Sequence, residues 1–158
     1  MSNLATALGF LDDLEQSEHY TKEAIKLQRR IGDRYGEVMN YNNLAWLYRD
    51  KNQLEAARKI TARTLEEAQR YGFDLITASA FDDLGTIYLE MGRFEDAVPC
   101  LAQSARRYEK MKAHGFLHAN YTALAKALAG MGEHKKAKEA ARLAERWERD
   151  IVTVAQHI

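Results

Sequence analysis

The chain has 158 residues, of which 46% are hydrophobic and 29% charged, so it is long enough to bury the core of one ordinary soluble domain. Lysine plus arginine and aspartate plus glutamate number 23 each, which gives a formal net charge of +0. Nucleic-acid binders and membrane-surface proteins usually carry a basic excess. The charge balance therefore argues against nucleic acid and membrane as partners.

Three further features predict a soluble, cytoplasmic protein. The single cysteine, Cys100, cannot form an internal disulfide, which fits a reducing compartment. Residues 1–13 have no basic region before their short apolar run, unlike a signal peptide. The longest uncharged stretch, residues 113–125, is too short and too polar to span a bilayer.

The sequence repeats itself at an interval of 40 residues. A leucine recurs as Leu4, Leu44, Leu84 and Leu124. The next position is always small: Ala5, Ala45, Gly85 and Ala125. A large residue follows at Leu8, Tyr48, Tyr88 and Leu128. Types that tolerate a left-handed backbone at a helix end then occur at Asp12, Asn52, Gly92 and Gly132.

Each unit of this repeat is predicted to form two helices, because Ala, Leu, Glu, Lys and Arg dominate and no strand-like alternation appears. The units span about 1–33, 34–73, 74–113 and 114–158 of a single domain, and the first is incomplete. First helices are expected at about 1–11, 35–51, 75–91 and 115–131. Second helices are expected at about 14–31, 54–71, 94–111 and 134–156. An isolated pair cannot bury its apolar faces, so the units must stack.

The pattern resembles the tetratricopeptide repeat (TPR) family. Its motif positions are matched in order by Leu84, Gly85, Tyr88, Gly92, Phe94 and Ala97. The motif's tryptophan is replaced by an aromatic residue and its closing proline is absent, and the repeat exceeds the common length of about 34 residues. In its length, the repeat of this sequence is similar to those of kinesin light chains, bacterial peptide-sensing regulators and the helical arms of large bacterial transcription activators. The resemblance implies an all-α, right-handed superhelical solenoid of about four helix pairs.

In TPR proteins the first helices line a concave groove that usually holds the ligand. Projected onto this sequence, the partner-binding residues are Asn42, Asn43, Trp46, Arg49, Asp82, Asp83, Thr86, Glu90 and Lys126. Asparagine can bond a peptide backbone, tryptophan offers an apolar plate, and the acidic residues favour a basic side chain. The prediction is a scaffold for a protein or peptide partner with basic residues. The alternative is that these side chains form a solvated polar face.

A second hypothesis is a structural element that homodimerises, or docks on a larger assembly, through open solenoid ends. The apolar residues expected at these ends are Leu8, Phe10, Trp147, Ile151 and Ile158. The stripe on the last helix has a simpler interpretation, in which it packs back on the last unit.

No pattern of catalytic or metal-binding residues is found. His114 and His118 have a spacing that can place two ligands on one helix face, but nothing in the sequence completes a metal site. The sequence has no phosphate-cradling glycine loop and no nucleophile elbow. Asp82 and Asp83 are adjacent and point to different sides of a helix, so they do not form an acid/base dyad. We expect no metal, no cofactor and no enzymatic activity.

Overall fold

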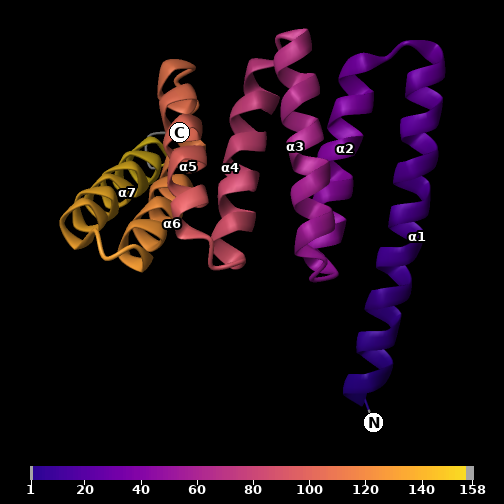
Figure 1. Cartoon of the computed structure of the whole chain (residues 1–158), viewed down its shortest axis with the longest axis horizontal. Coiled ribbons are helices and arrows are strands. Elements are labelled where there is room, and N and C mark those ends of the chain that lie inside the picture. Colours follow the sequence, from indigo (N-terminus) through magenta and orange to yellow (C-terminus); the bar gives the residue numbers. More distant parts are fainter. Residues whose placement is uncertain (1, 156–158) are drawn as a thin grey trace. The chain divides into compact units, whose positions relative to one another are not determined.

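The computed structural model describes the backbone of residues 2–155 and the side chains of residues 12–149. Its elements in chain order are α1 (Ser2–Ile31), α2 (Arg34–Asp50), α3 (Leu54–Tyr71), α4 (Asp74–Glu90), α5 (Phe94–Lys110), the short 3-10 helix η1 (His114–Phe116), α6 (Leu117–Gly130) and α7 (His134–Ala155) (Figure 1). The part of the chain that is described contains no strand, as the all-α prediction requires. Two compact units divide it, Met1–Phe73 and Asp74–Ile158.

Helices α2 to α7 begin and end close to the predicted residues, and three of the four predicted turns are confirmed. Asn52, Gly92 and Gly132 follow first helices and have φ values of 57°, 73° and 80°. This left-handed backbone lets the chain reverse directly into the second helix of the pair. Within the two units, α2 pairs with α3, α4 with α5, and α6 with α7.

The prediction of a turn near Asp12 is wrong, because α1 runs unbroken from Ser2 to Ile31. Asp12 is the only one of the four turn positions that holds neither glycine nor asparagine, so it adopts the left-handed backbone least readily. In the helix its carboxylate instead accepts a hydrogen bond from Gln16 Nε2 at 3.3 Å, a four-residue spacing that supports a helix. The N-terminal unit therefore contains three helices rather than two predicted pairs.

In the C-terminal unit, α4 and α5 approach each other closely at Gly85. A Cβ atom on Gly85 would lie 2.5 Å from Leu101 Cγ and 3.2 Å from the Leu101 backbone nitrogen. Leu101 is fully buried in a cluster that includes Ala97 and Leu124. The small residue of the repeat thus allows two helices to pack tightly, as the sequence predicts.

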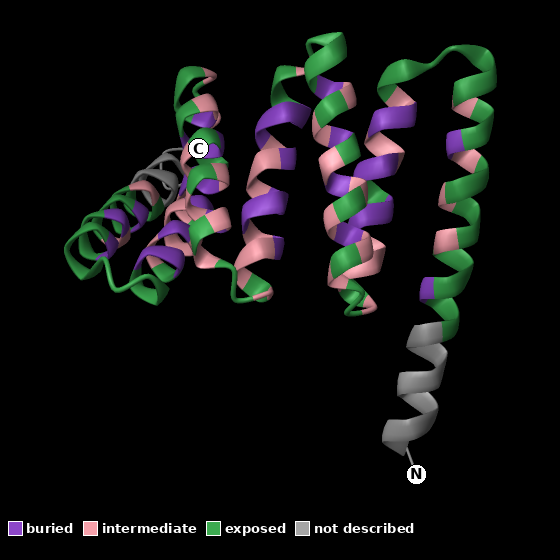
Figure 2. Ribbon diagram, viewed as in Figure 1, coloured by how far each residue is buried: buried purple, intermediate pink, exposed green. Residues whose placement is uncertain are grey.

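In the N-terminal unit, α1 is held against α2 by an apolar cluster of Ile25, Tyr41 and Leu44. Figure 2 shows that the buried positions of α1 face α2. Beside them, Lys22 Nζ and Lys51 Nζ lie 2.5 and 2.6 Å from the two carboxylate oxygens of Glu18. These hydrogen bonds lower the pKa of Glu18 to about 2.

A second carboxylate, Glu37, is buried at the other end of the same contact. Arg29 Nε and Arg34 Nη1 each donate to it at 2.9 Å. Burial alone would raise the pKa of Glu37, but the two arginines outweigh it and the pKa lies below its ordinary value. Charged pairs as well as apolar side chains therefore fix α1 on α2.

Replacing Gly85 with alanine should lower the free energy of unfolding by about 1–3 kcal/mol, because the new methyl group meets Leu101 and part of its backbone. Chemical denaturation measures this change. The control is Gly115→Ala, where a Cβ would meet nothing within 4 Å. Equal effects of the two substitutions would contradict the close approach of α4 and α5.

The Glu18 carboxylate should make stability depend on pH in a defined range. Its pKa is lowered from 4.5 to about 2 in the folded chain, so its contribution is fully present above pH 4.5. The contribution is lost as the pH falls from about 4.5 to about 2. Chemical denaturation at pH values across this range should show that the free energy of unfolding falls less with decreasing pH for Glu18→Gln than for wild type. Glu15→Gln, on an exposed part of α1, should behave like wild type.

Candidate functional site

The predicted acidic pair lies in the middle of α4, in the C-terminal unit. Asp83 is only 9% exposed and Asp82 is half-buried. Neither residue belongs to the motif positions that hold the helix pair together. Partly buried carboxylates at positions that the repeat does not dictate are candidates for a role other than packing.

The position of Asp82 is fixed by Asn120, a residue that is not among the predicted site residues. Asn120 lies on α6, is fully buried, and donates from Nδ2 to Asp82 Oδ1 at 2.6 Å. The same Nδ2 donates to the Leu101 carbonyl oxygen at 3.2 Å. Asn120 Oδ1 is also buried and finds no hydrogen-bond partner in the described part of the chain. One amide thus joins the carboxylate on α4 to both α5 and α6.

A signal for Asn120 exists in the repeat. Asn40 precedes the aromatic residue of α2 just as Asn120 precedes that of α6, at twice the 40-residue interval. Asn40 Nδ2 donates to Gln28 Oε1 on α1 at 2.7 Å. Each asparagine therefore bonds the α-helix that precedes its own helix pair, α1 for Asn40 and α5 for Asn120. The equivalent residue in the third unit is Ala80, which hides the pattern.

Helix α5 contributes two buried side chains with hydroxyl groups near the acidic pair. Ser104 Oγ donates to the Ala78 carbonyl oxygen at 2.9 Å, which ties α5 to α4. The nearby Tyr108 side chain is almost fully buried and stacks on Phe116, with ring centroids 4.8 Å apart. Burial, with smaller effects from Asp82 and Asp83, raises the pKa of Tyr108. The part of α4 that carries the acidic pair is therefore held by buried contacts with α5.

The other predicted residues of this unit flank the acidic pair on α4 and α6. Thr86 Oγ1 donates to the backbone oxygen of Asp82 at 2.9 Å, so its proton is engaged within α4 while its oxygen can still accept. Glu90 and Lys126 are exposed. The structure thus joins one orienting amide to the Asp82 carboxylate, with Asp83 next to Asp82 in α4 and a cation further along α6.

In the N-terminal unit the predicted residues of α2 differ in exposure. Trp46 is 51% exposed, whereas Arg49 is half-buried. Asn43 is exposed and donates to Asn40 Oδ1 at 3.3 Å. Asn42 is buried, and its Oδ1 has no hydrogen-bond partner among the described residues. Because these residues and the acidic pair belong to different units, a shared groove stays a prediction.

The apolar residues predicted for oligomer contacts are placed only in part. Trp147 is half-buried on the Leu117 cluster of its own unit, 4.5 Å from the His114 ring centroid. The side chains of Leu8, Phe10 and Ile151 and the whole of Ile158 lie outside the described residues.

The two spaced histidines both have packing roles. His118 Nδ1 bonds the Ala144 carbonyl oxygen at 2.9 Å, and His114 lies against Trp147. Among the residues that the structure describes, no group of three His, Cys, Asp or Glu side chains could hold a metal ion. Burial raises the pKa of the Cys100 thiol, which keeps it in its less reactive form.

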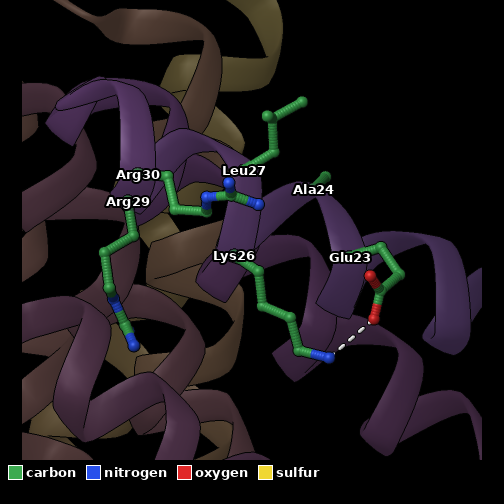
Figure 3. A pocket seen from close by; sticks show the side chains of 6 residues that line it. All are labelled: Glu23, Ala24, Lys26, Leu27, Arg29 and Arg30. Atoms are coloured by element: carbon green, nitrogen blue, oxygen red, sulfur yellow. Dashed lines mark hydrogen bonds and ion pairs between the residues drawn. The ribbon is translucent and has the colours of Figure 1, made fainter.

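A surface hollow outside the predicted groove lies along α1 (Figure 3). Its lining residues all come from this one helix: Glu23, Ala24, Lys26, Leu27, Arg29 and Arg30. Lys26 Nζ pairs with Glu23 Oε1 at 2.7 Å, as the dashed line in Figure 3 shows. A single helix face does not enclose a small ligand, but it can contact another helix.

Most of the chain matches the pattern of one known repeat family. The tetratricopeptide repeat pattern matches residues 1–66 and 53–110, and a second tetratricopeptide repeat pattern matches residues 118–151. The chain belongs to the tetratricopeptide repeat family. A search of curated proteins found no match. Within the described part of this TPR chain, no helix is long and apolar enough to cross a membrane.

Solved structures share the TPR fold at low sequence identity. BtubC (BKLC) from P. vanneervenii is 18% identical with a TM-score of 0.80, and the match covers 94% of this chain and 61% of that chain. The apo form of RapI is 19% identical with a TM-score of 0.85 and coverages of 91% and 53%. Aspartyl phosphate phosphatase F from Bacillus subtilis is 14% identical with a TM-score of 0.83 and coverages of 94% and 39%. The TPR chain therefore spans less than two thirds of each of these longer proteins.

Proposed function

We propose that this TPR chain is a protein-interaction scaffold that binds a peptide or partner segment along its first helices. In this proposal Asp82 and Asp83 contact a lysine or arginine of the partner, and Trp46 offers an apolar surface. Asn43 would bond the partner backbone, and each unit would add further contacts: Asn42 and Arg49 in the N-terminal unit, and Thr86, Glu90 and Lys126 in the C-terminal unit. The TPR repeats that make up the chain support this class of function.

The observation that carries the proposal is the fixed position of the Asp82 carboxylate, with the buried Asp83 beside it in α4. Asn120 holds one Asp82 oxygen at 2.6 Å, and the surrounding helix packing limits the motion of Asp83. A carboxylate has two oxygens and can accept about four hydrogen bonds, more than the one that Asn120 donates. Charge-assisted bonds are roughly twice as strong as neutral ones, and a preorganised acceptor loses less entropy on binding. A basic side chain is the partner chemistry that such a site would select.

A peptide array with matched variants tests this proposal. Each peptide is paired with a version in which its lysines and arginines are replaced by alanine, and binding is confirmed in solution by fluorescence anisotropy. Asp83→Asn keeps the side-chain shape and removes the charge, so it should weaken binding to basic peptides by about tenfold. Glu139→Gln, an exposed acid on α7, should leave binding unchanged.

Circular dichroism should show that both variants keep the wild-type helix content. The proposal would be contradicted if the folded Asp83→Asn variant bound its basic peptides as tightly as wild type. A preference for peptides without basic residues would contradict it as well.

A further inference from the structure

One apolar face of α1 is uncovered in the N-terminal unit. Tyr20, Leu27 and Ile31 are 70%, 58% and 68% exposed, and the half-buried Ala24 lies between the first two. Their spacings of four, three and four residues put them on one side of the helix. These four residues are called the α1 stripe below. The stripe does not include the buried Ile25, which packs on Tyr41 and Leu44 of α2.

The internal repeat shows what this face does in the other units. Ala24 corresponds to Ser104 on α5 and to Ala144 on α7, at two and three intervals of 40 residues. Ser104 Oγ donates to a backbone oxygen of α4, and the Ala144 carbonyl oxygen lies 2.9 Å from its hydrogen-bond partner, Nδ1 of His118 on α6. At both equivalent positions the second helix thus contacts the first helix of its own pair. The α1 stripe has the pattern of a surface that packs on a helix.

No segment of the described unit supplies that helix. Because α1 is continuous from Ser2, residues 2–11 extend along the helix axis and do not fold back over the stripe. Helices α2 and α3 belong to the other side, where Tyr41 and Leu44 contact Ile25.

The charges beside the α1 stripe identify a fitting occupant. Glu23 and Arg30 are seven residues apart and lie along the same edge of the stripe. Suppose that a second α1 packs antiparallel, with Ala24 opposite Leu27 and Tyr20 opposite Ile31. Glu23 of each copy then lies beside Arg30 of the other, which gives two equivalent ion pairs about a twofold axis. In a parallel arrangement Glu23 would instead meet the uncharged Gln28, and no ion pair would form.

We propose that this chain forms a homodimer in which the α1 stripes of two copies pack antiparallel, with Glu23 of each copy paired to Arg30 of the other. The contacts within one copy allow Glu23 to leave its own Lys26 and pair with Arg30 of the other copy. Glu23 pairs only with Lys26 among the ion pairs of the described residues, and both side chains are largely exposed, so the pair contributes little. Among the described residues Arg30 takes part in no ion pair, and Figure 3 draws none from it to the other five residues. Figure 3 shows Ala24 and Leu27 between these two charged residues.

Sedimentation of the whole chain over a range of concentrations tests the apolar contact. Wild type should dimerise, and Leu27→Asp should sediment as a monomer with unchanged helix content, because Leu27 is exposed and its loss removes no core contact. Leu143→Asp is the matched control, since Leu143 is an exposed leucine on α7. The control should still dimerise. A wild type that stays monomeric, or a Leu27→Asp variant that dimerises like wild type, would overturn the proposal.

Charge exchange tests the antiparallel register. Glu23→Arg alone and Arg30→Glu alone each place like charges together twice, so each should weaken dimerisation by about tenfold. Mixing the two single variants should restore association as a heterodimer, and so should combining both changes in one chain. Added salt should reduce these differences. If the mixture associated no better than the separate variants, the register would be wrong.

Discussion

Close approach between the two helices of a pair is the constraint on which this fold depends. A helix pair can exclude water only if its backbones come near enough for short side chains to meet. In the C-terminal unit this happens at Gly85, where even one added carbon would overlap Leu101. Ala57 and Ala97 are fully buried at the corresponding face of α3 and α5. Small residues thus decide where the helices touch, and the larger residues of the repeat fill the remaining space.

The same constraint explains which features could be predicted from the sequence. Helix bounds and the turns at Asn52, Gly92 and Gly132 follow from local backbone preferences, and the structure agrees with them. At Asp12 the local preference is weak, and the helix continues where the repeat predicts a break. A periodic pattern therefore indicates where a turn fits, while the residue at that position determines whether the turn forms.

The candidate site could be predicted only in part, because its geometry depends on contacts distant in sequence. Asp82 and Asp83 were selected because the repeat does not require acids there. Asn120 is not predicted, because its two acceptors lie 38 and 19 residues away in the sequence and the asparagine of the repeat recurs only at Asn40. Carboxylates also serve a different purpose in the N-terminal unit, where lysines and arginines hold Glu18 and Glu37 between α1 and α2. Acidic residues in this chain thus stabilise one contact between helices and, in our proposal, recognise a partner at another position.

The most direct measurement of the central claim is an amide NMR titration of the labelled chain with the tightest basic peptide from the array. Recognition by the acidic pair predicts the largest chemical-shift changes at Asp82, Asp83 and Thr86 on α4. It also predicts a shift of the Asn120 side-chain amide, because that group donates to Asp82. Shifts that saturate with the peptide but leave these residues unchanged would contradict the account.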